Sequence, residues 1–241
     1  MLIQCTAALQ AKIKKYVDIL DLAMMQAEDA KVGSAEDFFA WHANIHPFDQ
    51  QHSCYIDSNK IAGFKAIRNT VVLTNNVSHA PAIIVAARSA TFKDFVDEIK
   101  KAVRLVLLEY GATDAFIAQY LAEPVLFTKS GTRRQIGLHN GVVKYLQWVA
   151  PDWVGECNGN LEMFPSCAIK HVKSYLVGAP DYYELGERTE KALKSMGGLR
   201  EDADTWEKRI AREKEAFSFV NDENKRENGK VVFLTDFLWG H

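Results

Sequence analysis

The helix predicted for residues 92–110 constrains the fold more than any other segment. Its apolar side chains recur every three or four positions and form a broad face, made of Phe92, Phe95, Val96, Ile99, Val103, Val106, Leu107 and Tyr110. Thr91 is placed to cap the start of this helix, and Gly111 is placed to end it. Because a face of this width packs on a β-sheet, the rest of the chain is expected to supply one.

Short runs of apolar and alternating residues predict the strands of that sheet, at 2–5, 41–46, 70–74, 82–86 and 125–127. In the second of these, Trp41, Ala43 and Ile45 would face one way, and His42, Asn44 and His46 the other. Thr6 and Thr113 are placed to cap further helices. The sequence therefore predicts an α+β fold, with an antiparallel or mixed β-sheet packed by a long amphipathic helix and with a C-terminal α-helical hairpin appendage.

Composition favours a soluble cytoplasmic protein. The 241 residues are 48% hydrophobic and carry a net charge of -2, so no global positive field argues for nucleic acid. There is no signal-peptide pattern and no apolar run long enough to span a bilayer. The four cysteines lie in a chain long enough to build a core without disulfides, so free thiols are expected.

A change in composition near Gly178-Ala179-Pro180 predicts a domain boundary, because charged residues become denser after it. We expect an α+β main domain at 1–178 and a charged helical extension at 179–241. The extension ends in an apolar tail, residues 231–239, which needs a docking surface or a partner. A homo-oligomer formed through this C-terminal segment is one possible use of the tail.

The stretch Val125–Asn140 reads as a strand, a polar turn and a helix. Backbone N–H groups and the positive end of the helix dipole would meet there, as in an anion site. The candidate binding residues are Lys129, Ser130, Thr132, Arg133, Arg134, His139 and Asn140. Gly137 and Gly141 would let the helix approach a neighbour closely. Since no Walker A, G-x-G-x-x-G or G-x-S-x-G pattern is present, a solvated turn is favoured over an anion site.

Four potential metal ligands, His42, His46, His52 and Cys54, lie close together in the sequence. Their spacing matches no zinc pattern, and H-E-x-x-H is absent. Ordinary polar strand residues are therefore the favoured interpretation, with no metal and no cofactor. Trp41, His42 and Asn44 remain candidates for a binding site.

Several short motifs occur in an order that resembles a family of uncharacterised bacterial proteins, known only as a domain of unknown function. They are Ile3-Gln4-Cys5-Thr6, Trp41-His42-Ala43-Asn44, Val72-Leu73-Thr74-Asn75 and Phe127-Thr128-Lys129-Ser130 followed by Gly137-x-x-Asn140. The resemblance covers about residues 1–150, with residues 48–69 as an insertion. It implies a small α+β domain in a cytoplasmic bacterial protein, and it brings no activity or catalytic residue.

Three functional hypotheses follow. The leading one is a non-enzymatic interaction or regulatory protein that binds a protein or nucleic acid, in a role linked to mobile elements or defence. The alternative is an enzyme acting on a phosphorylated or otherwise anionic substrate, held at the Lys129–Arg134 turn, with His139 or His42 as general acid or base. The third is a metalloprotein that uses His42, His46, His52 or Cys54.

Overall fold

The structure, a computed structural model, describes residues 1–20, 38–48, 69–85, 87–129, 133–156, 160–173, 176–177, 183–205 and 207–212. The chain divides into two compact units, Met1–Ala203 and Asp204–His241. In the second unit the description is limited to a short stretch that includes a helical segment at 207–212. The predicted apolar tail therefore lies outside the described residues.

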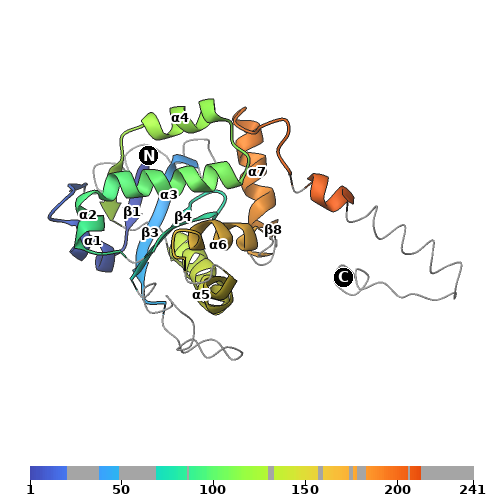
Figure 1. Ribbon diagram of the computed structural model, residues 1–241. Coiled ribbons are helices and arrows are strands. Elements are labelled where there is room, and N and C mark those ends of the chain that lie inside the picture. Colours follow the sequence, from blue (N-terminus) through green and yellow to red (C-terminus); the bar gives the residue numbers. More distant parts are fainter. Residues whose placement is uncertain are drawn as a thin grey trace, which may run out of the picture. The chain divides into compact units, whose positions relative to one another are not determined.

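A six-stranded mixed sheet forms the centre of the first unit (Figure 1). Its strands are β1 (Leu2–Cys5), β2 (Ile19–Leu20), β3 (Ala40–His46), β4 (Thr70–Asn75), β5 (Pro81–Ile84) and β6 (Leu126–Lys129). They are ordered β2-β6-β1-β3-β4-β5 across the sheet. The strands from β2 to β3 run parallel, whereas β4 is antiparallel to both of its neighbours. The predicted α+β fold with a mixed sheet is confirmed.

One face of the sheet packs on the long amphipathic helix that the sequence predicted. This helix, α3 (Phe95–Glu109), buries six side chains, and α1 (Ala7–Ile13) covers the same face through Leu9 and Ile13. The sheet contributes Trp41 and Leu73 to this larger core. The predicted alternation of β3 is therefore correct, since Trp41 and His42 lie on opposite faces.

The opposite face of the sheet is covered by α5 (Arg133–Glu156), assisted by α6 (Phe164–Val172) (Figure 1). Val72 and Ile83 of the sheet pack there against Val142, Val143 and Leu146 of α5. Helix α5 follows β6 directly in the chain, as expected for a strand, turn and helix. It therefore spans the face on which His42 lies.

Three threonines were predicted to cap helices, and the hydrogen bonds of their hydroxyl groups decide whether they do. Helix α2 (Ser89–Lys93) begins before Thr91, whose hydroxyl accepts a bond from the Arg88 N–H at 3.1 Å, and a turn at Asp94 separates it from α3. Thr6 stands at the start of α1, but its hydroxyl bonds Asn44 and caps nothing. Thr113 does cap α4 (Asp114–Ala122) by accepting from the Phe116 N–H at 3.2 Å.

Helix α5 departs from local expectation in two places. It continues past Pro151 to Glu156, although proline usually ends or kinks a helix. Proline removes one backbone N–H from the helix, and the helix accommodates that loss. A Cβ added at Gly137 or Gly141 would meet no atom within 4 Å, so neither glycine serves a close helix contact.

The first compact unit extends beyond the domain boundary predicted at 178. After the β7–β8 pair (Leu176–Val177 and Tyr183–Glu184), helix α7 (Leu185–Ser195) buries Leu185 and Leu193 in the two cores of this unit. Ala112 and Leu199 then form an isolated β-bridge. The first helix of the expected C-terminal hairpin is thus part of the main fold.

Candidate functional site

Three histidines from two elements meet between the sheet and α5, and we refer to His42, His46 and His139 as the histidine cluster. Strand β3 places His42 and His46 on the face covered by α5, and α5 supplies His139. The Nε2 atoms of His46 and His139 are 3.0 Å apart. The His42 and His139 rings meet edge to face, with centroids 4.8 Å apart.

A fourth side chain, Thr74, orients the cluster from the neighbouring strand. Thr74 lies opposite His42 in the β3–β4 pairing, and its Oγ1 is 3.0 Å from Nδ1 of His139. This contact directs the other ring nitrogen of His139, Nε2, towards His46. His139 therefore has a partner on each side of its ring.

His42 has no such partners. Its side chain is 1% exposed, and neither ring nitrogen has a hydrogen-bond partner. Buried polar groups in folded proteins are nearly always hydrogen-bonded, so a buried water, an ion or a ligand is the ordinary partner of an imidazole at this depth.

Burial keeps the three imidazoles uncharged near neutral pH. Desolvation lowers the pKa of His42 to about 4, and desolvation together with the nearby His42 lowers that of His46 to about 4. For His139, desolvation and then its two histidine neighbours lower the pKa to about 2. Neutral imidazole is the form that offers a nitrogen lone pair to a proton or a cation.

The cluster lies towards the carboxyl ends of the parallel strands, because His46 is the last residue of β3 and α5 begins just after β6. Ligands of α/β sheets bind outside such strand ends. Two further polar side chains, Gln4 and Thr128, share the face and the row of His42 across β1 and β6. The neighbouring Asn76 has a buried Oδ1 without a partner.

The predicted anion turn joins this region only in part. Lys129 is exposed at the end of β6, and the register with Cys5 places it on the sheet face opposite His42. Arg133 is exposed at the first position of α5. Ser130, Thr132 and the side chain of Arg134 lie outside the described residues.

The remaining candidates divide between the two faces. The Trp41 indole is buried in the core and donates to the Tyr120 hydroxyl at 2.8 Å, away from the cluster. Asn44 shares the face of His42, but its Oδ1 accepts from the Thr6 hydroxyl and from the Ile45 N–H. Asn140 is exposed on α5.

His52 and Cys54 lie outside the described residues. Of the four potential metal ligands that the sequence offered, the structure therefore describes His42 and His46. In the described part of the chain, no three or more His, Cys, Asp or Glu side chains stand in an arrangement that could hold a metal ion. Cys5 and Cys167 are reduced thiols in the described part of the chain, and burial raises the pKa of Cys5 to about 12.

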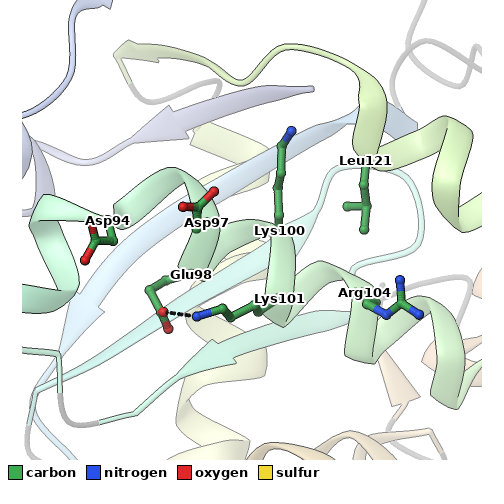
Figure 2. A pocket seen from close by; sticks show the side chains of 7 residues that line it. All are labelled: Asp94, Asp97, Glu98, Lys100, Lys101, Arg104 and Leu121. Carbon is green, nitrogen blue, oxygen red and sulfur yellow. Dashed lines mark hydrogen bonds and ion pairs between the residues drawn. The ribbon is translucent and has the colours of Figure 1, made fainter.

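A surface pocket of about 500 Å³ lies elsewhere, along α3. Figure 2 shows its lining: the side chains of Asp94, Asp97, Glu98, Lys100, Lys101 and Arg104, with Leu121 from α4. Acidic and basic groups balance there, and Lys101 pairs with Glu98 at 2.7 Å. This pocket therefore selects no charge, and none of the predicted binding residues lines it.

Thr74 was missed as a site residue, and His46 was considered only as a metal ligand. The alternation of β3 could have added His46 to His42, since the two side chains share a face. The part played by Thr74 depends on the β3–β4 register, for which the sequence holds no signal.

None of the helices in the described ranges is long and apolar enough to cross a membrane. No curated protein and no solved structure matches the chain. One family does match over residues 65–183, a range that begins and ends later than the resemblance predicted for 1–150. It includes Thr74 and His139 but leaves out His42 and His46. Over residues 65–183 the chain is thus similar to the family described as a domain of unknown function (DUF6933).

Proposed function

We propose that the protein is an enzyme with the histidine cluster as its reaction centre, acting on a phosphorylated or otherwise anionic substrate. The observation that carries the proposal is the meeting of His139, from the β6–α5 segment, with His42 and His46 of β3. The ring nitrogens of these histidines come from segments far apart in the sequence. A solvated polar turn at Lys129–Arg134 would not require His139 to contact β3.

The anionic character of the substrate is supported by α5. Arg133 stands in the first turn of this helix, on the order of 9 Å along its axis from His139. The positive end of the helix dipole lies at the same place. Lys129 points to the other face and is given no role in holding the anion.

The experiment is a turnover screen with phosphomonoesters, phosphodiesters and carboxylate esters. His46→Gln and His139→Gln are expected to abolish turnover, whereas His171→Gln, at an exposed histidine of α6, should leave it unchanged. Arg133→Ala should raise KM more than it lowers kcat. Turnover that survives both cluster substitutions would refute the proposal.

A protein partner is the second candidate, because Trp148 on α5 is 53% exposed. Large aromatic side chains are enriched where proteins bind one another. A partner recovered by the full chain but not by Trp148→Ala would support this function. Recovery of the same partner by the variant would show that Trp148 takes no part in binding it.

A further inference from the structure

We propose that Thr74 sets the direction of a hydrogen-bond chain through His139 to His46, so that His46 offers its Nδ1–H at the surface to an anionic oxygen of the substrate. This inference deepens the proposed function and rests on it for the nature of the ligand. The direction of the chain depends only on the geometry of the three side chains. His46 is then the residue that meets the substrate, and Thr74 and His139 are positioning residues.

Thr74, His139 and His46 form a continuous chain of hydrogen bonds. Oγ1 of Thr74 lies 3.0 Å from Nδ1 of His139, and Nε2 of His139 lies 3.0 Å from Nε2 of His46. Both rings are neutral near pH 7, because burial lowers their pKa values. Since a neutral imidazole carries one N–H and one lone pair, the choice of donor at the first contact fixes the donor at the second.

The two possible directions differ in the fate of the Thr74 hydroxyl hydrogen. If Thr74 donates to Nδ1 of His139, Nε2–H of His139 donates to His46, and every buried hydrogen of the chain has an acceptor. If Nδ1–H of His139 donates to Thr74 instead, the hydroxyl hydrogen needs an acceptor of its own. Thr74 is 2% exposed, and among the described residues its side chain bonds no second acceptor.

A buried donor without an acceptor is costly, so the first direction is favoured roughly tenfold or more. An oxygen with an unused lone pair is more common in protein interiors than a hydrogen without an acceptor. His139 thus carries its hydrogen on Nε2, and His46 carries its hydrogen on Nδ1. For His46 this is the reverse of the form that a solvated neutral histidine favours, so Thr74 sets the tautomer.

Nδ1 of His46 is also the ring nitrogen of the cluster that a molecule from solution can reach. Both nitrogens of His42 are enclosed, and both nitrogens of His139 are used by the chain. His46 is half-buried at the end of β3, and within the described ranges its Nδ1 is neither enclosed nor hydrogen-bonded. A substrate therefore meets the cluster at this atom.

A neutral imidazole N–H suits an anionic oxygen. It donates a hydrogen bond while keeping its proton, and in a site partly shielded from water such a donor stabilises negative charge that develops on the oxygen. Because burial lowers the pKa of His46 to about 4, the ring keeps this neutral form near pH 7. His46 thus acts as a fixed hydrogen-bond donor, held in direction by His139 and Thr74.

The test is the ¹⁵N spectrum of the histidine rings in the unmodified full chain at pH 7, assigned with His46→Gln and His139→Gln. We expect hydrogens on Nε2 of His139 and on Nδ1 of His46. Thr74→Val should lose this preference at both rings, whereas Thr74→Ser, which keeps the hydroxyl, should retain it. The exposed His171 is the control, and its resonances should be the same in all Thr74 variants. A hydrogen on Nδ1 of His139 or on Nε2 of His46 in the unmodified protein overturns the proposal.

Inorganic phosphate tests the contact given to His46. Phosphate should move the Nδ1 resonance of His46 in the unmodified protein, and Thr74→Val should weaken phosphate binding roughly tenfold. A His46 resonance that phosphate leaves in place refutes the contact. The expected tautomers without turnover of any ester would remove the proposed function and keep the direction of the chain. Turnover that requires His46, with the hydrogens placed the other way, would do the reverse.

Discussion

At the scale of single residues, the histidine cluster makes the stability of the protein depend on pH. An imidazole in the unfolded chain takes up a proton near pH 6.5, whereas His42 and His46 in the folded chain do so near pH 4 and His139 near pH 2. Between pH 6.5 and 4 the unfolded chain therefore binds more protons, and stability is lost as the pH falls through this window. Each unit of difference in pKa corresponds to ~1.4 kcal/mol.

We expect the free energy of unfolding of the protein, measured in urea, to fall by several kcal/mol between pH 7 and 4. His42→Gln should flatten this dependence, because it removes one of the three titrating groups. His171→Gln, at an exposed site, should keep it. A slope that His42→Gln leaves unaltered would contradict the assignment.

A second prediction at this scale concerns the buried contact of Trp41. The Tyr120 hydroxyl accepts from the indole N–H at 2.8 Å and donates to the Phe38 carbonyl at 2.5 Å. Tyr120→Phe leaves the indole N–H buried without an acceptor, which costs about 1–3 kcal/mol in urea unfolding. Tyr16→Phe, at a half-buried tyrosine beside the same core, should change stability by less than about 0.5 kcal/mol. Equal effects would mean that this hydrogen bond contributes nothing specific.

At the scale of elements, α5 carries glycines that its packing does not require. Gly137 and Gly141 are helical, and an added Cβ would meet nothing within 4 Å. Alanine at either position should therefore stabilise the protein by about 0.5–1 kcal/mol, since glycine loses more backbone entropy in a helix. Gly198→Ala is the opposite case, because its Cβ would lie 2.5 Å from the Phe116 ring. Thermal unfolding should rank Gly198→Ala below the unmodified protein and the two α5 variants above it.

Elements were predictable where local patterns decide them. The alternation of Trp41 and His42 on β3 and the apolar face of α3 both follow from side-chain periodicity within one segment. The cluster was not predictable in the same way. His139 meets β3 only because α5 crosses that face of the sheet, a result of tertiary packing.

At the scale of the whole molecule, the two cores decide where the chain can be divided. A cut after Gly178, the boundary predicted from composition, removes α7 and with it Leu185 and Leu193, both fully buried. Loss of a buried leucine side chain costs about 2–5 kcal/mol, so losing both approaches the whole stability of a typical domain, about 5–15 kcal/mol. A cut after Ala203 keeps every core residue that the structure describes.

We therefore expect a chain of residues 1–203 to unfold in one cooperative transition in urea, with native-like near-UV circular dichroism from the buried Trp41. A chain of residues 1–178 should lack both signals or aggregate. The Ala112–Leu199 bridge adds to the difference, because it joins the end of the longer fragment to the loop after α3. Cooperative unfolding of the 1–178 chain with undiminished stability would show that α7 is dispensable to the cores. The boundary would then belong near Gly178, where the change in charge first placed it.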